Sequence, residues 1–185
     1  MALKLSVSEV NSMKEDEFEI VFGNVIELCA DAANTVKKAR PFKGVLDICS
    51  AFHGYLDDLD FEGDNPNGLL IIMGQKLVIL KLHPDLAGRL AAQGELTPES
   101  TNEQKSAGLH DLTTADKKTI DESNRIYKEK FGFPFIICAR ENRVKSIIAG
   151  LRTRYNNTRK EEINTGIEEV KKICKLRILD IVKDV

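Results

Sequence analysis

Residues 160–182, KEEINTGIEEVKKICKLRILDIV, carry the periodic pattern that decides the fold class. Their apolar side chains recur at steps of three and four residues, the spacing that lines one face of a helix. These side chains belong to Ile163, Ile167, Val170, Ile173, Cys174, Ile178, Ile181 and Val182. The segment therefore predicts a long helix with one buried face.

The same spacing recurs in three other parts of the chain. Residues 15–29, 44–59 and 144–153 each place apolar side chains on one helical face, and Gly23 is a candidate break within the first of these segments. Nothing in the chain resembles the alternating strands and helices of a parallel sheet. We therefore expect an all-α fold, a single compact helical bundle domain formed by residues 1–185.

Two further helices are indicated by their end signals. Thr97 followed by Pro98 offers an N-cap and a proline at the first helical position, so a helix should begin there. Thr113 or Thr114 can cap the next helix, which should end at Gly132.

Three segments carry other patterns. Residues 62–68 are rich in Gly, Asn and Pro and predict a loop. Residues 69–82 are ambiguous, because their β-branched residues favour a strand while their length favours a buried helix, and we interpret them as helix. Residues 133–139 combine a proline with a short β-branched and aromatic run, so an extended crossing is expected.

Composition excludes several classes of protein. The chain has 185 residues, 30% of them charged and 42% hydrophobic, with a formal net charge of -2. Neither disorder nor a polyanion-binding surface is indicated, so nucleic acid is not expected as a partner. The longest apolar stretch is interrupted by charge, which argues against a membrane span, and no secretory signal is visible at the N-terminus.

The four cysteines show no metal-binding or redox spacing. Cys29, Cys49, Cys138 and Cys174 are scattered along the chain without a C-x-x-C pair. Reduced and mostly buried thiols are the expected state, and no metal site is predicted. The common nucleotide, cofactor and hydrolase motifs are also absent from the sequence.

His83 is the most prominent candidate for acid–base chemistry. It ends an apolar segment directly before Pro84, where a helix must close, so its imidazole can reach a pocket. A histidine at this place is otherwise typical of a helix end, where it interacts with the last carbonyl groups.

A polar cluster and a single arginine each have both a functional and an ordinary interpretation. Ser100, Glu103 and Gln104 cluster on the helix after Thr97, where a solvated helix face is the ordinary explanation. Arg177 lies among apolar residues of the last helix. It is either a surface cation with a buried stem, which the pattern favours, or a guanidinium directed at a carboxylate.

Three motifs that occur together, in a set order and spacing, favour the functional interpretations. They are His83-Pro84-Asp85-Leu86-Ala87-Gly88, Ser100-Thr101-Asn102-Glu103-Gln104 and Lys130-Phe131-Gly132-Phe133-Pro134-Phe135-Ile136. Together the motifs resemble the OHCU decarboxylases, and the likeness extends over nearly the whole chain. Enzymes of this family convert 2-oxo-4-hydroxy-4-carboxy-5-ureidoimidazoline into (S)-allantoin and carbon dioxide in the degradation of uric acid.

The resemblance implies a role for each matching position. His83 would be the proton donor or acid–base group, and Glu103 the second reactive group. Arg177 would hold a carboxylate or ring carbonyl of the small-molecule ureidoimidazoline substrate. The remaining substrate-binding positions implied are Pro84, Ser100, Thr101, Asn102, Glu103, Gln104, Phe135, Ile136, Ile137, Cys138 and Ala139.

The chemistry of the substrate agrees with a site made of ordinary side chains. Loss of carbon dioxide leaves an electron pair that the ring C=N group of the substrate can accept, so no pyridoxal, thiamine or metal cofactor is required. We hypothesise that Glu103 and His83 act as a coupled pair, while amides of residues 135–139 orient the ring. A positioned acid such as His83 accelerates a reaction by ~10²- to 10⁴-fold.

Three points stay open at this level. A catalytically silent helical interaction module, or an enzyme acting on a related ureide or purine ring, would have a similar sequence. A homodimer is expected by resemblance. Animal members of the family are often peroxisomal through a C-terminal S-K-L-type tripeptide, but this chain ends Lys183-Asp184-Val185, so peroxisome and cytosol both stay possible locations.

Overall fold

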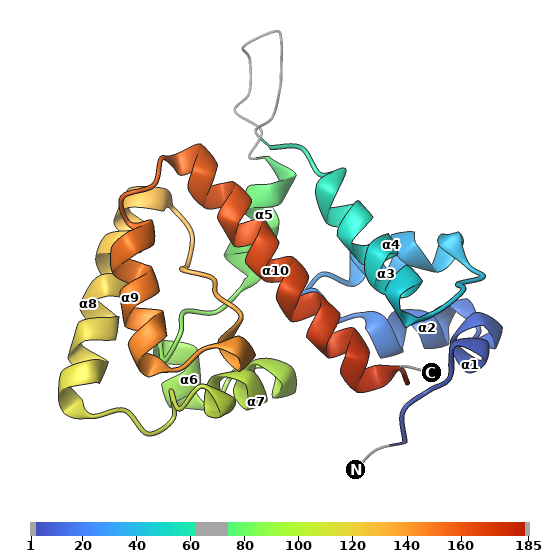
Figure 1. Ribbon diagram of the computed structural model, residues 1–185, viewed down its shortest axis with the longest axis horizontal. Coiled ribbons are helices and arrows are strands. Elements are labelled where there is room, and N and C mark those ends of the chain that lie inside the picture. The colour runs from blue at the N-terminus through green and yellow to red at the C-terminus, as the bar shows by residue number, and fades with distance from the viewer. Residues whose placement is uncertain (1–2, 62–73, 184–185) are drawn as a thin grey trace, which may run out of the picture. The chain divides into compact units, whose positions relative to one another are not determined.

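The computed structural model describes residues 3–61 and 74–183. The secondary structure of these residues is helical, apart from one isolated parallel bridge between Leu5 and Val182 (Figure 1). The predicted all-α fold class is confirmed. The chain divides into two compact units, residues 1–82 with 171–185 and residues 83–170, and each is described by itself.

The first unit is built from two separate stretches of chain. Its core includes a chain of stacked rings, with centroids 4.5 Å apart for Phe18 and Phe22 and 6.1 Å apart for Phe22 and Phe52. Its helical elements are α1 (Val7–Ser12), α2 (Glu15–Phe22), α3 (Ala30–Val36), η1 (Lys37–Ala39), α4 (Val45–Asp57), α5 (Gln75–Leu82) and the last part of α10 (Arg159–Ile181).

The second unit is one continuous stretch and contains the three motifs singled out in the sequence. Its helical elements are α6 (Arg89–Gln93), α7 (Pro98–Ser106), α8 (Thr114–Phe131), η2 (Ala139–Glu141), α9 (Val144–Arg154) and the first part of α10. Helices α8 and α9 pack against each other, and α7 packs against η2. The extended crossing predicted for residues 133–139 is free of helix up to Cys138, and η2 begins at Ala139 (Figure 1).

Helix ends follow the predicted caps. Thr97 is the N-cap of α7, and its side chain accepts a hydrogen bond from the amide of Ser100 at 3.3 Å. Thr113, rather than Thr114, caps α8 by accepting from the amide of Asp116 at 3.0 Å. At the other end of α8, Gly132 has φ 80°, the left-handed conformation that glycine adopts without strain.

Some predicted helices are shorter than expected. The pattern over residues 15–29 does not form one helix, because α2 ends at Phe22 and the chain turns at Gly23. Val25 and Ile26 are nevertheless buried, so the apolar spacing there reflects burial in a turn. Helix α5 begins at Gln75, and the predicted loop of residues 62–68 and the helix start at residue 69 lie outside the described residues.

The two ends of the described chain meet within the first unit. The amide of Leu5 donates to the carbonyl of Ile181, and the amide of Lys183 donates to the carbonyl of Leu5, both at 2.8 Å. The N-terminal segment is thereby fixed to the end of α10.

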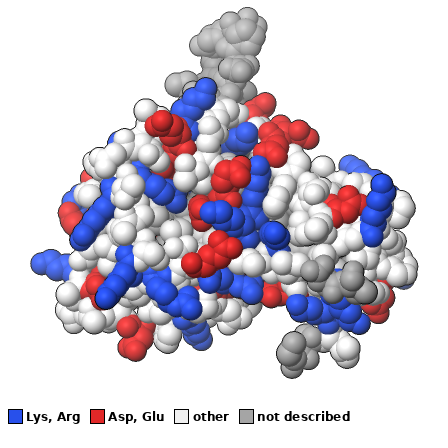
Figure 2. Space-filling view, in the orientation of Figure 1, with Lys and Arg blue, Asp and Glu red and all other residues white. Residues whose placement is uncertain are grey.

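Within residues 3–61 and 74–183, no helix is long and apolar enough to cross a membrane. The face shown in Figure 2 has Lys and Arg side chains interspersed with Asp and Glu. The charge on this face is therefore mixed, in line with a formal net charge of -2.

Candidate active site

The loop after α5 carries the candidate acid His83. Helix α5 ends at Leu82, as the following proline requires, and His83 is only 8% exposed, with its Nε2 atom shielded from solvent. The loop then turns tightly, because the amide of Gly88 donates to the carbonyl of Asp85 at 3.2 Å. A Cβ atom at Gly88 would lie 2.6 Å from the Cβ of Asp85, so only glycine fits there.

Helix α7 presents the second motif. Ser100, Glu103 and Gln104 are buried, so the ordinary explanation of a solvated helix face is wrong for these three side chains. Thr101 is half-buried and Asn102 is exposed. Ala107 and Leu109 are buried and anchor the end of α7.

The loop of His83 and helix α7 are joined directly. The side-chain oxygen Oε1 of Gln104 accepts a hydrogen bond from the amide of Ala87 at 2.8 Å. Helix α8 holds the same loop, because Nδ2 of Asn124 donates to the carbonyl of Leu86 at 3.0 Å. Asn124 is not predicted from the sequence, since one polar residue within the pattern of a long amphipathic helix carries no signal of its own.

Residues 133–139 form a segment in which every side chain except that of Ile137 is buried. Phe135, Ile136, Cys138 and Ala139 are at most 5% exposed, whereas Ile137 is half-buried and Pro134 buried. Two backbone groups of this segment bind side chains of the second unit: the carbonyl of Ile136 accepts from Arg154 at 2.7 Å, and the amide of Cys138 donates to Glu169 at 2.7 Å. The amide of Cys138 thus donates its hydrogen bond to a side chain of the protein itself.

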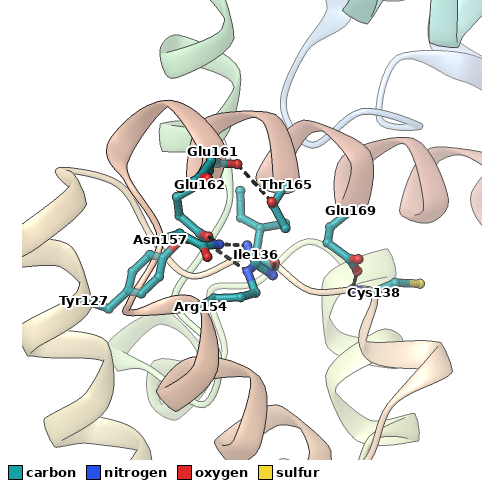
Figure 3. A network of polar contacts seen from close by, with 9 residues as sticks. All are labelled: Tyr127, Ile136, Cys138, Arg154, Asn157, Glu161, Glu162, Thr165 and Glu169. Atoms are coloured by element: carbon teal, nitrogen blue, oxygen red, sulfur yellow. Dashed lines mark hydrogen bonds and ion pairs between the residues drawn. The ribbon is translucent and has the colours of Figure 1, made fainter.

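A buried carboxylate organises the contacts behind this segment (Figure 3). Glu162 on α10 has no exposed surface. It accepts hydrogen bonds from Arg154 Nε at 2.8 Å, from Asn157 Nδ2 at 2.7 Å and from the hydroxyl of Tyr127. The guanidinium of Arg154 also lies over the ring of Phe135, 4.4 Å from its centroid. Arg154 therefore connects α9, α10 and residues 135–136.

Electrostatics connect Glu103 with the same segment. Burial raises the pKa of the Cys138 thiol to about 11, and the negative charges of Glu141, Glu169 and Glu103 add to this effect. Glu103 on α7 thus acts on Cys138, which agrees with the packing of α7 against η2. A thiol with a raised pKa is a poor nucleophile at neutral pH, so Cys138 is not a candidate for covalent catalysis.

A cavity of about 360 Å³ lies beside α7 in the second unit. Thr101 and Gln104 line it together with Ala87, whereas His83 and Glu103 are not among its lining residues. The cavity thus brings together part of the predicted substrate-binding set. In the described part of the chain, no group of three His, Cys, Asp or Glu side chains is arranged to hold a metal ion.

Arg177 belongs to the first unit, on the last part of α10. It is 4% exposed, so the surface interpretation favoured by the sequence is wrong. Its guanidinium forms a 2.7 Å ion pair with Glu27, which is also buried, and donates to the carbonyl of Asn24 at 2.8 Å. The alternative, a guanidinium directed at a carboxylate, describes these contacts.

Comparison with known proteins identifies the family. The family model of OHCU decarboxylase matches residues 11–179. The chain belongs to the OHCU decarboxylase family.

Relatives in this family are similar over nearly their whole length. A 2-oxo-4-hydroxy-4-carboxy-5-ureidoimidazoline decarboxylase of Amia calva is 40% identical over 179 residues, which are 97% of this chain and 95% of the relative. A protein of the same name from Mus musculus is 38% identical, over 96% of this chain and 93% of the relative. The similarity to these OHCU decarboxylases is therefore not confined to the three motifs.

Two solved structures share the fold. A crystal structure of (S)-allantoin synthase gives a TM-score of 0.72 at 21% identity and covers 97% of this chain, which spans 54% of that protein. A crystal structure of OHCU decarboxylase in the presence of (S)-allantoin gives a TM-score of 0.64 at 22% identity, covering 92% of this chain and 100% of the other. The helical architecture is therefore shared with both of these solved proteins.

Proposed function

We propose that this chain decarboxylates 2-oxo-4-hydroxy-4-carboxy-5-ureidoimidazoline to (S)-allantoin and carbon dioxide in the degradation of uric acid. The observation that carries the proposal is membership of the OHCU decarboxylase family over residues 11–179. The burial of His83 and Glu103 within one compact unit supports it, because shielded acid and base groups are typical of an active site.

The reaction can proceed with the side chains of the chain itself. The bond between the ring and the carboxylate breaks, carbon dioxide leaves, and the electron pair passes into the adjacent ring C=N group. One proton must then be delivered to the product. We assign this delivery to His83, because an imidazole is able to donate and to accept a proton near neutral pH.

Glu103 is proposed as the partner of His83. Its carboxylate either orients the imidazole or repels the carboxylate of the substrate, which favours loss of that group in the transition state. Delivery of the proton from one face would give one enantiomer, so the pair is expected to control the stereochemistry of the product.

The substrate-binding residues are proposed from the family resemblance. Pro84, Ser100 to Gln104 and residues 135–139 would surround the ring. The resemblance also implies Arg177 as a binding residue for a carboxylate or ring carbonyl, and in the first unit its guanidinium binds Glu27 and the carbonyl of Asn24. Burial of Ser100 and Gln104 supports this assignment, whereas exposed Asn102 has the weakest structural support. A homodimer, and a location in peroxisomes or cytosol, are further expectations from the family.

Circular dichroism with freshly generated substrate tests the proposed function, because it detects (S)-allantoin directly. The wild-type chain should produce the (S) enantiomer faster than the spontaneous reaction. His83→Ala and Glu103→Ala should keep the helical spectrum but lose acceleration by ~10²- to 10⁴-fold together with stereocontrol.

Matched variants show whether these losses are specific. Glu95→Ala removes an exposed carboxylate from the loop before α7, and His53→Ala removes an imidazole from α4. Both should retain activity. A wild-type chain that forms no (S)-allantoin would favour a silent interaction module, and an unchanged rate in His83→Ala would refute the assignment of His83.

A further inference from the structure

One peptide group in the loop of His83 is held from both sides. The bond between Leu86 and Ala87 presents its carbonyl to Nδ2 of Asn124 at 3.0 Å and its amide to Oε1 of Gln104 at 2.8 Å. The two side chains come from different helices, α8 and α7. A peptide plane held at both its donor and its acceptor has little freedom to rotate.

The backbone at this place needs such support. Ala87 has φ 51°, a left-handed conformation that residues with a Cβ rarely adopt. Strained backbone persists only where the surroundings impose it, and such places cluster at functional sites. Here the strained residue lies four positions after His83, in the loop that carries it.

The two amide side chains are well placed to impose this conformation. Asn124 is 7% exposed and Gln104 is 6% exposed, so water does not compete freely for their hydrogen bonds. Asn124 lies on the same face of α8 as the buried rings of Tyr127 and Phe131, which follow it by three and seven residues. It is thus mounted on a packed helix.

A third contact joins the same helix to the loop. Nζ of Lys128, one turn after Asn124 on α8, lies 2.9 Å from the carboxylate of Asp85. This pair is partly exposed and contributes little energy by itself, so Asn124 provides the main link between α8 and the loop.

We propose that Asn124 is a positioning residue of the decarboxylase, which fixes the His83 loop through the Leu86 carbonyl in concert with Gln104. The inference rests on the proposed function. It also adds a role for Gln104, whose oxygen accepts from the amide of Ala87 and so holds the loop.

Asn124→Asp tests the proposal with a side chain of the same size. The substitution removes the N–H donor and places a carboxylate oxygen against the carbonyl of Leu86, so the loop should lose its anchor. We expect kcat to fall about 10- to 100-fold with KM little changed, because a displaced acid weakens the transition state more than substrate binding. Asn34→Asp makes the same chemical change on the exposed face of α3 and should leave kcat unchanged.

A second readout needs no substrate. In the protein without substrate, the NMR signal of the His83 ring should broaden or split in Asn124→Asp. A merely structural role would lower the melting temperature and leave both the His83 signal and kcat at low temperature as in wild type. Asn124→Leu, which has a similar size but no N–H donor, replaces the first variant if Asn124→Asp does not fold.

The outcomes separate this inference from the proposed function. Loss of kcat with an altered His83 signal supports it. A folded Asn124 variant with the kcat and His83 signal of wild type overturns it. If wild type forms no (S)-allantoin, the proposed function fails by itself, and the NMR comparison still decides whether Asn124 positions the loop.

Discussion

Glu162 illustrates how a single charge is accommodated in this protein. An ionised carboxylate without exposed surface is unfavourable unless it is paired and hydrogen-bonded. Arg154, Asn157 and Tyr127 meet this need from three directions, and Arg154 extends the contacts to the carbonyl of Ile136. The carboxylate therefore supports the backbone next to the candidate active site without taking part in chemistry.

Tyr127→Phe is expected to lower the free energy of unfolding by about 1.5–3 kcal/mol, the usual contribution of a hydrogen bond to a charged group. The variant removes only the hydroxyl that donates to Glu162. Urea unfolding monitored by circular dichroism measures the change. Tyr155→Phe is the matched control, because that residue is 38% exposed and its ring packs on Phe131. Equal stability of the two variants would contradict the role given to Glu162.

Cys138 should react slowly with iodoacetamide in the folded protein. Burial raises the pKa of its thiol to about 11, so little thiolate exists at about pH 8.5, near the ordinary cysteine value. Mass spectrometry of the peptide that contains Cys138 gives the rate of alkylation. The same protein in urea is the control and should react much faster; similar rates would disprove the raised pKa.

The same shift predicts how stability changes in alkaline solution. Because the folded pKa lies above the unfolded one, the contribution of Cys138 to stability is complete below pH 9.0 and is lost as the pH rises toward about 11. Cys138→Ala should reduce this alkaline loss of stability, provided that the variant folds.

At the level of helices, the end of α8 depends on the backbone of one residue. Gly132 has φ 80°, and a Cβ atom built on it would meet nothing within 4 Å. A side chain at this position would therefore destabilise the protein through its backbone conformation and not through contact with neighbouring atoms. The position matters because residues 133–139 leave the helix at this point.

Gly132→Ala should destabilise the protein by about 1–2 kcal/mol, the cost of a left-handed conformation for a residue with a Cβ. Gly54→Ala in the middle of α4 is the matched control, since a Cβ there also meets nothing within 4 Å and the residue is helical. That variant should stabilise the protein by about 0.5–1 kcal/mol. Melting curves of both variants decide, and shifts in the same direction would contradict this explanation.

Helices with strong end signals and long apolar faces are predicted well from the sequence. Thr97 with Pro98 marks the start of α7, and Thr113 and Gly132 mark the two ends of α8, each within one residue. The short helices α1, α3 and α6 escape prediction, because five to seven residues hold too few apolar positions to show a period. The break after α2 lies at Gly23, the candidate break in the sequence, although the apolar spacing continues beyond it.

The candidate site is predicted only in part. Burial of His83, Glu103 and Gln104 agrees with the family resemblance, but periodicity alone favours a helix end or a solvated face. The bond between Gln104 and Ala87 joins residues 17 positions apart and depends on the left-handed turn of the loop. Such contacts arise from tertiary packing, which local sequence patterns do not encode.

For the molecule as a whole, the ends of the chain are part of the fold of the first unit. Leu5 exchanges two backbone hydrogen bonds with Ile181 and Lys183, each 2.8 Å long. The N-terminal segment therefore contributes to holding the last turn of α10.

Leu5→Pro should lower stability by about 1 kcal/mol, because proline cannot donate the hydrogen bond to the carbonyl of Ile181. Hydrogen exchange at the end of α10 and the melting temperature measure this effect. Leu3→Pro, at a residue that is 92% exposed, is the control and should behave as wild type. No difference between the two variants would show that the bridge adds nothing to stability.

The division of the chain also has a consequence for its synthesis. A ribosome releases the chain from the N-terminus onward, and domains generally fold as units when their residues have emerged. Residues 1–82 emerge first, but their unit lacks residues 171–185 until these have also emerged. The unit of residues 83–170 is complete earlier, although it lies later in the chain. The part that carries His83 and Glu103 should therefore fold on the ribosome before the unit of residues 1–82 with 171–185 is complete.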